Sequence, residues 1–179
     1  MVRIKVRNGR ENMKNSIVLW LMMIGLVPLE AFAMDDDNSR ATLRGLTEIS
    51  VVVDKLSDEA ANAGLSQEQL SGLMESKLAA ARIQVGPSTG VSLFLKVTVI
   101  LPDPKSRSYA YHISMELYQT VSLVRDSTVT VVTPTWSLGQ LGTVGKAQIV
   151  QTVESAVSDF ADQFTGAFYS VNAPPVPTQ

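Results

Sequence analysis

The chain has 179 residues, of which 15 are lysine or arginine and 17 are aspartate or glutamate, with one histidine and no cysteine. The absence of cysteine excludes thiol catalysis, disulfide bonds and cysteine-ligated metal sites. The small acidic excess makes the chain a poor electrostatic match for nucleic acid or for an anionic lipid surface.

The first 33 residues follow the order of an export signal. Basic residues come first, an apolar run over 17–27 follows, Pro28 breaks that run, and Ala31 and Ala33 are small residues at the positions that a signal peptidase reads. A transmembrane helix needs about 20 apolar residues, and this run is shorter. We therefore expect residues 1–33 to be a cleaved signal peptide that leaves no membrane span. A start at Met13 instead of Met1 would give the same signal, and the sequence leaves that choice open.

Cleavage would remove five basic and two acidic residues and leave 146 residues, ten of them basic and fifteen acidic, so that the mature net charge is −5. That length fits one domain with a proper core. We expect residues 34–44, which begin with an aspartate run, to be a flexible N-terminus. Residues 45–172 would form the domain, and the proline-rich residues 173–179 a disordered tail.

Alternation of apolar and polar residues predicts four strands. Gly45–Asp54 contains a β-branched run that favours a buried strand. Val91–Leu101 and Tyr109–Arg125 alternate with period two and should pair as a long antiparallel hairpin, each with one apolar and one mostly polar face. Thr128–Leu138 predicts the last strand, and Pro134 within it requires a sheet edge or a bulge.

Two further segments have helical periodicity. The first begins at Ser66 with a capping box and a hydrophobic staple and should end near Arg82. The second carries an apolar stripe from Ile149 to Val171, which includes Phe160 and Phe164. The resulting β-α-β-β-β-α order predicts an α+β fold, a two-layer sandwich with a mainly antiparallel sheet and two amphipathic helices on one face.

The single histidine, His112, lies on the polar face of its strand with Ser114 and Glu116. This trio has the residue types of a hydrolase, but successive same-face residues on a straight strand are about 7 Å apart, beyond direct hydrogen-bond reach. We interpret it as a polar strip on a solvated sheet face. Neither a catalytic residue, a cofactor nor a metal site is predicted.

A run of glycines precedes the second helix. Gly142, Gly145 and the adjacent Lys146 have the composition of an anion-binding loop at a helix N-terminus. The spacing does not match a phosphate-binding P-loop, and glycines also suit a tight turn from strand to helix. We expect a structural turn here and keep anion binding as the alternative.

The polar faces of the long strands also carry large apolar side chains. We expect Phe94, Ile100, Tyr118 and Trp136 on or near the sheet face that the helices do not cover. Such an exposed patch is typical of a partner or ligand surface. The alternative is that a terminal segment folds over these residues.

Several stretches resemble a group of small exported bacterial proteins of unknown function. They are Leu43-Arg-Gly-Leu46 before Val51–Val53, the Glu59–Leu65 run, Tyr109-Ala-Tyr111 with Glu116-Leu117, Thr135-Trp136-Ser137 with Gly142–Gly145, and Asp162-Gln-Phe164. The resemblance implies an envelope, periplasmic or secreted location and supplies no activity. The order of elements is also similar to that of small periplasmic accessory modules.

These observations favour a non-enzymatic exported protein that binds an envelope protein, whose identity the sequence leaves open together with the oligomeric state. The alternative is a carrier of a small molecule or lipid in the space between helices and sheet. A hydrolase built on His112 and Ser114 is a more distant hypothesis.

Export gives the first testable prediction. The basic, apolar and Ala-x-Ala order should direct cleavage after Ala33, so N-terminal sequencing of protein from the envelope fraction should begin at Met34. Protein that retains Met1 or Met13 in that fraction would contradict a cleaved signal.

Overall fold

The computed structural model describes residues 33–87 and 90–173. These residues belong to one compact unit, Ala31–Gln179. The expected signal peptide and the proline-rich tail lie outside the described residues, apart from Ala33 and Ala173 at their ends. Within the described part, no helix combines the length and the apolar character that a membrane crossing requires.

The described residues form a sheet of five strands in the order β2-β1-β3-β4-β5. They are β1 (Glu48–Val53), β2 (Gln84–Val85), β3 (Val91–Ile100), β4 (Ser108–Leu123) and β5 (Asp126–Gly145). The three long strands pair antiparallel, whereas β1 runs parallel to both β2 and β3. A parallel pair needs a long crossover, and helix α4 (Gln67–Ala80) supplies it between β1 and β3.

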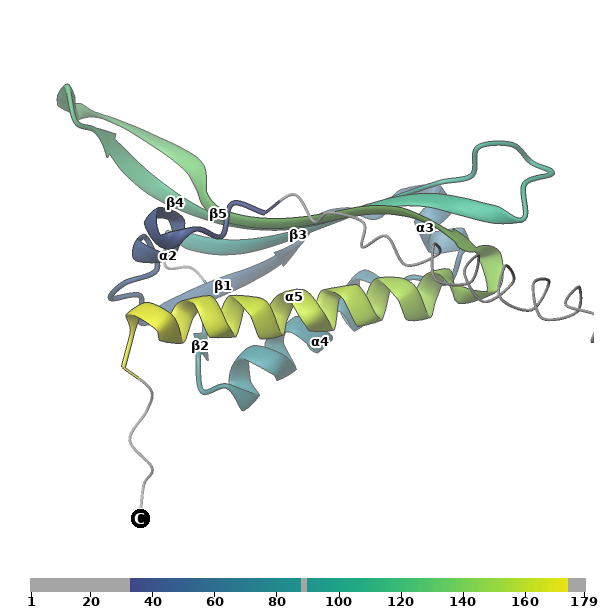
Figure 1. The fold of residues 1–179 in the computed structure, drawn as a ribbon, viewed down its shortest axis with the longest axis horizontal. Helices are drawn as coiled ribbons and strands as arrows, with labels where there is room; N and C mark the ends of the chain where they lie inside the picture. The colour runs from purple at the N-terminus through teal and green to yellow at the C-terminus, as the bar shows by residue number, and fades with distance from the viewer. Residues whose placement is uncertain (1–32, 88–89, 174–179) are drawn as a thin grey trace, which may run out of the picture. The chain divides into compact units, whose positions relative to one another are not determined.

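Helices α4 and α5 (Ile149–Val171) lie on one side of the sheet, which confirms the predicted α+β class (Figure 1). Ser66 caps α4 by accepting a hydrogen bond from the Gln69 N–H at 3.4 Å, and Leu65 and Leu70 are both buried as the staple requires. A short 3-10 helix, η1 (Lys146–Gln148), leads into α5. The described residues also form two short helices, α2 (Asp37–Ala41) and α3 (Asp58–Asn62).

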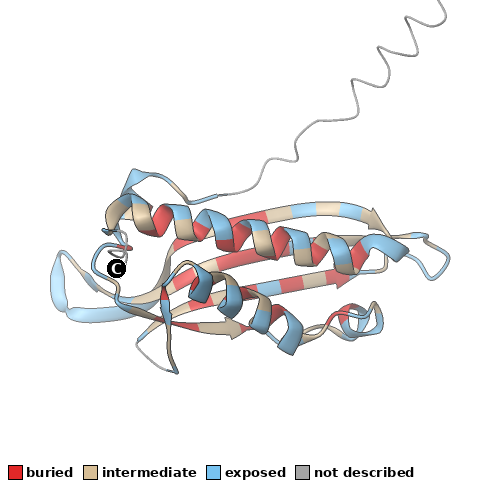
Figure 2. Ribbon diagram, turned by 90° about the horizontal axis from the view of Figure 1, so that it is seen from below, coloured by how far each residue is buried: buried red, intermediate tan, exposed pale blue. Residues whose placement is uncertain are grey.

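The core lies between the apolar face of the sheet and the two helices (Figure 2). Ile113, Met115 and Leu117 on β4 have no exposed surface, and Phe164 on α5 is equally buried. The apolar stripe of α5 therefore covers the apolar alternate residues of β4, as the two periodicities predict.

The segment before β1 corrects the expectation of a flexible N-terminus over residues 34–44. Met34 pairs with Ser137 at the outer edge of β5, and Asp36 caps α2 through the Ser39 N–H. Leu43, which follows α2, is fully buried, and its carbonyl accepts a hydrogen bond from Asn172 Nδ2 at the end of α5. This segment is part of the domain.

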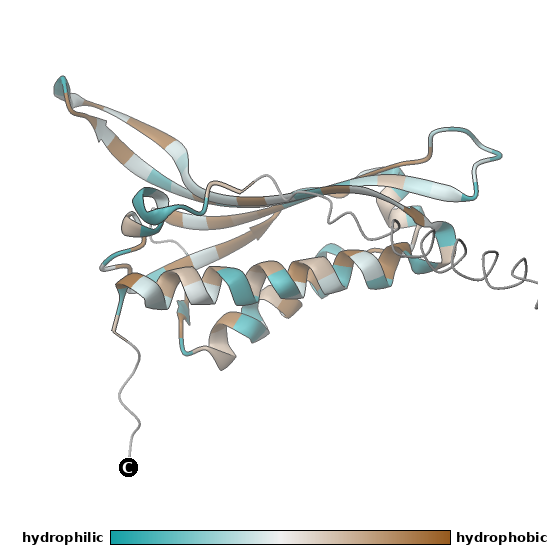
Figure 3. Cartoon of the chain, in the orientation of Figure 1, coloured by the Kyte–Doolittle hydropathy of each residue, from teal (hydrophilic) through white to brown (hydrophobic). Residues whose placement is uncertain are grey.

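Strands β4 and β5 continue beyond the ends of β1 and β3 as a two-stranded hairpin, which we call the arm (residues 119–133) (Figure 1). A register shift between Leu117 and Tyr118 separates the arm from the body. It coincides with Pro134, and β5 is also the edge strand, so both features expected around this proline are present. Brown bands of apolar residues mark the arm in Figure 3.

Truncation of the central aromatic tests the core. Phe164→Ala should reduce the free energy of unfolding by about 3–5 kcal/mol, because the ring is fully buried against the sheet. Phe94→Ala is the matched control: its ring is only partly buried, so about 1 kcal/mol is expected. Equal losses for the two variants in denaturant unfolding would contradict this assignment of the core.

Candidate functional site

The sheet face opposite the helices, which we call the open face, carries the even-numbered side chains of β3 and β4. Val52, Phe94, Glu116 and Ser137 lie side by side across four strands. The rings of Phe94 and Tyr118 meet edge to face, with centroids 5.0 Å apart and planes at 67°. Both rings remain partly exposed. They form an aromatic pair near the arm end of this face.

A carboxylate holds the tyrosine of this pair in place. The Tyr118 hydroxyl donates to Glu116 Oε2 at 2.8 Å. This hydrogen bond is the main cause that raises the pKa of Tyr118, with burial and the charge of Glu116 adding to it. The tyrosine is thus a fixed, neutral group with an apolar ring and a bound polar end, which suits an interface anchor.

Ile100 lies on the open face as expected but does not join the aromatic pair. It lies six positions along β3 from Phe94, about 20 Å on an extended strand. Its neighbourhood is a second apolar spot, since Ile100 is 55% exposed and Leu141, opposite His112 on β5, is 53% exposed. Lys96 and Thr98 separate the two spots on β3.

Trp136 corrects the predicted patch. Its side chain has no exposed surface and packs edge to face on Phe164 at 5.0 Å, so it lies on the helix side of the sheet. Its indole N–H donates to Asp35 Oδ1 at 2.7 Å, and Arg40 donates two hydrogen bonds of 2.7 Å to the same carboxylate. The hydrogen bond from Arg40 is the main cause that lowers the pKa of Asp35, against an opposing effect of burial.

The candidate anion-binding loop is a strand. Gly142 and Gly145 belong to β5 and pair with Tyr111 and Ser108 of β4, so their backbone groups are part of a ladder. Gly142 is required by packing, because a Cβ there would lie 2.7 Å from the Tyr111 hydroxyl oxygen. Lys146 extends over the ring of Tyr109 at 5.8 Å from its centroid. These residues therefore form the end of a strand instead of the predicted turn.

His112 is exposed, opposite Thr98 and Leu141 in the ladder. Within residues 33–87 and 90–173, no hydrogen bond links it to Ser114 or Glu116, and Glu116 accepts from Tyr118 instead. Nor do any three His, Asp or Glu side chains in this part of the chain lie close enough to hold a metal ion.

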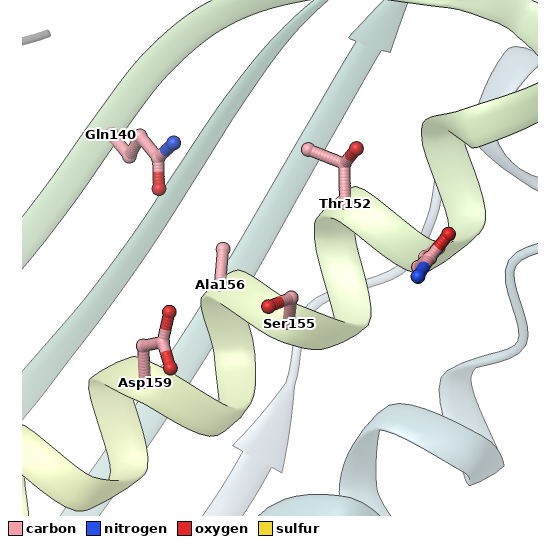
Figure 4. Close-up of a pocket in the computed structure, with 6 residues that line it drawn as sticks. Gln140, Thr152, Ser155, Ala156 and Asp159 are labelled. Carbon is pink, nitrogen blue, oxygen red and sulfur yellow. The ribbon is translucent and has the colours of Figure 1, made fainter.

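A shallow hollow of about 340 Å³ lies between β5 and α5 (Figure 4). Apart from Ala156 its lining side chains are polar, and most of them come from the helix: Gln140, Gln151, Thr152, Ser155, Ala156 and Asp159. It has one carboxylate and no cation to pair with a substrate. The hollow offers hydrogen bonds to solvent and no recognisable chemistry.

A groove also runs along the outer edge of β1, beyond the short β2. One part, of about 560 Å³, lies between β1 and α4, and an adjoining part of about 480 Å³ continues past the end of β2. Its floor is apolar, with Val51, Val52 and Val53, and its rim on α4 carries Glu68 and Glu75. We call it the β1 groove. Sequence reasoning missed it, because it depends on where β2 stops pairing.

Comparisons with known proteins give only distant structural neighbours. No protein-family model and no curated protein matches the chain. Three similar solved structures are the PelC dodecamer from Paraburkholderia phytofirmans (TM-score 0.37, 15% identity, 63% of this chain and 82% of that one), a minor lipoprotein from Acinetobacter baumannii (0.39, 12%, 69% and 91%) and the rare lipoprotein B from Shewanella oneidensis (0.36, 13%, 69% and 94%). Because the TM-scores and sequence identities are this low, the function has to be argued from the residues of this chain.

The contacts of Asp35 predict a pH-dependent stability. Because folding lowers the pKa of this carboxyl from its usual 3.8, the stabilisation is complete well above that value and is lost as the pH falls through the lower folded pKa. Asp35→Asn should therefore cost about 1–2 kcal/mol at neutral pH, and less in acid. Denaturant unfolding from neutral to acidic pH measures the difference. The exposed Asp159→Asn is the charge-matched control, and a pH-independent loss for Asp35→Asn would contradict the prediction.

Proposed function

We propose that this chain is a non-enzymatic protein of the bacterial envelope that binds a protein partner through the open face. The observation that carries the proposal is the aromatic pair of Phe94 and Tyr118, which is ordered by packing and by the bond to Glu116 while remaining partly exposed. Pre-ordered aromatic side chains are frequent anchors in protein interfaces, since little conformational entropy is lost when they are buried.

The surroundings of the pair favour a protein over a small ligand. The open face is a flat sheet surface in which Val52 and the aromatic rings adjoin charged Glu116 and Lys96. An apolar centre with a polar margin is the usual anatomy of a protein interface, whereas small molecules bind in concave pockets.

The space that a carrier would need between helices and sheet is occupied. Met115, Trp136 and Phe164 meet there without exposed surface. A hydrolase at His112 also has little support, because its neighbours on the strand make no hydrogen bond to it within the described residues. The export signal of residues 1–33 is the basis for placing the proposed partner in the envelope.

The proposal predicts a site-specific contact in cells. A photoreactive phenylalanine analogue at position 94 should crosslink to a protein of the envelope, and Tyr118→Ser should reduce the yield of that adduct. The matched control places the same analogue at Gln163, an exposed residue of α5 on the opposite side of the domain. Mass spectrometry of the adduct distinguishes a protein from a lipid.

A second comparison separates the aromatic pair from the rest of the open face. A variant that combines Thr98→Ala with His112→Ala changes two opposed polar residues of the same face and should keep the adduct. An equal yield at positions 94 and 163, an adduct with lipid alone, or loss of the adduct in the Thr98 and His112 variant would overturn the proposal.

A further inference from the structure

The arm has an outer edge that is free along most of its length. Strand β5 pairs with β4 on one side, and on its other side the only strand contact within the described residues is the bridge from Ser137 to Met34, outside the arm. Exposed sheet edges are normally protected by lysine, proline or a bulge. Residues 128–133 read Thr-Val-Thr-Val-Val-Thr and contain no charge and no proline.

The arm also exposes apolar side chains. Val132 is 68% exposed, Val129 and Val131 are each more than two-fifths exposed, and Val124 at the tip is entirely exposed. Arg125 beside it makes no ion pair with any described residue, whereas Asp126 accepts hydrogen bonds from Thr128 within its own turn. The arm therefore offers a free strand edge, exposed valines and an arginine that has no ion-pair partner among the described residues.

The β1 groove offers the complementary features. Ile49 and Val53 direct their carbonyl groups to the outer edge, where the first accepts from the Gly86 N–H and the second from Gln67 Nε2. Because alternate residues of a strand face the same edge, Val51 between them also presents its backbone N–H and carbonyl there, and no described residue pairs with these groups.

The walls of the groove allow a strand to approach. A Cβ added at Gly72 would meet no heavy atom within 4 Å, so the α4 wall of the groove is open at this point. Glu75 on the rim accepts a hydrogen bond from Ser71 and has no cationic partner among the described residues. The groove thus combines an unpaired strand edge, a valine floor and an acidic rim.

From these matched features we infer that the arm of one copy of this chain docks in the β1 groove of a second copy. Both halves of the contact occur on one chain, and they cannot meet within it because β1 and β5 lie on opposite sides of β3 and β4 in the sheet. Strand pairing would satisfy the edge groups of Val51, the valines would meet, and Arg125 would reach a carboxylate of α4.

This contact is heterologous, since different surfaces of the two copies meet, and each copy keeps one free arm and one free groove. Repetition gives a ring if the rotation between copies closes and a filament if it does not. The inference is independent of the open face, so it stands or falls separately from the proposed function. Insertion of the arm into a lipid surface is less favoured, because the charged Arg125 and Asp126 at its tip would have to enter the bilayer.

The test is the assembly state of the full mature chain, measured by light scattering and sedimentation over a range of concentrations. Wild type should associate beyond a monomer. Arg125→Glu should weaken association about tenfold, and Lys105→Glu, the same charge change in the exposed loop between β3 and β4, should leave it unchanged. Combining Arg125→Glu with Glu75→Arg should restore association if the strands pair parallel, and combining it with Glu68→Arg should do so if they pair antiparallel.

Crosslinking tests the geometry without relying on charge. Because the chain has no cysteine, Val131→Cys and Gly72→Cys introduce single thiols without background. A short bismaleimide added to a mixture of the two variants should join arm to groove, and the chain with both changes should form a ladder of multimers. Val131→Cys mixed with Asp159→Cys should give no such product.

A monomer at every concentration, or association that is unaffected by Arg125→Glu and gives no crosslink between arm and groove, would overturn the inference. Binding of the monomer to vesicles of neutral lipid, abolished by Val132→Ser, would overturn it in favour of a membrane-binding arm.

Discussion

The contact between the apolar face of β4 and the stripe of α5 is the one on which the rest of the domain depends. β4 is central among the three long strands, and Ile113, Met115 and Leu117 on it are fully buried against the helix layer. Because side chains alternate along a strand, burying this row directs Ser114, Glu116 and Tyr118 to the opposite face. The packing of the core therefore sets the composition of the open face.

The same contact explains why the arm is exposed. The helices cover β4 and β5 in the body of the sheet. Pairing between β4 and β5 continues as far as Ser122 and Thr130, whereas pairing between β3 and β4 ends at Gln119. Past Gln119 no third strand and no long helix of the described residues accompanies them, so apolar residues that would be buried within the sheet remain exposed. The exposure of the valines thus follows from a difference in length between the paired strands and their cover.

Two kinds of surface result, with different physical characters. The open face presents side chains, among them an aromatic pair fixed by Glu116, and it can bind without any change in hydrogen bonding of the backbone. The arm and the β1 groove instead present unpaired backbone groups, whose burial is favourable only when another strand satisfies them. The two proposed contacts, one with a different protein and one with a further copy of the chain, therefore use separate surfaces.

The sequence by itself determined the elements whose signal is periodic. The capping box at Ser66, the stripe of α5 and the alternation of β3 and β4 correspond to the observed helices and strands, because each pattern repeats over several turns or rungs. The α+β class follows from these elements, and so does the presence of Phe94 and Tyr118 on one face. The edge-to-face contact between their rings depends on a register that the alternation alone does not give.

Only the tertiary structure decided the rest. The bulge near Pro134 shifts the alternation of β5 by one residue. Before it the odd-numbered Val131 lies opposite Val121, and after it the even-numbered Trp136 lies opposite Leu117 and joins the buried face. The glycines up to Gly145 form a strand because they pair with β4, and Gly142 leaves the space that the ring of Tyr111 occupies. The N-terminal segment is ordered by Trp136, which lies 101 positions away from Asp35 along the chain. Each of these depends on a partner remote in sequence, which no local pattern encodes.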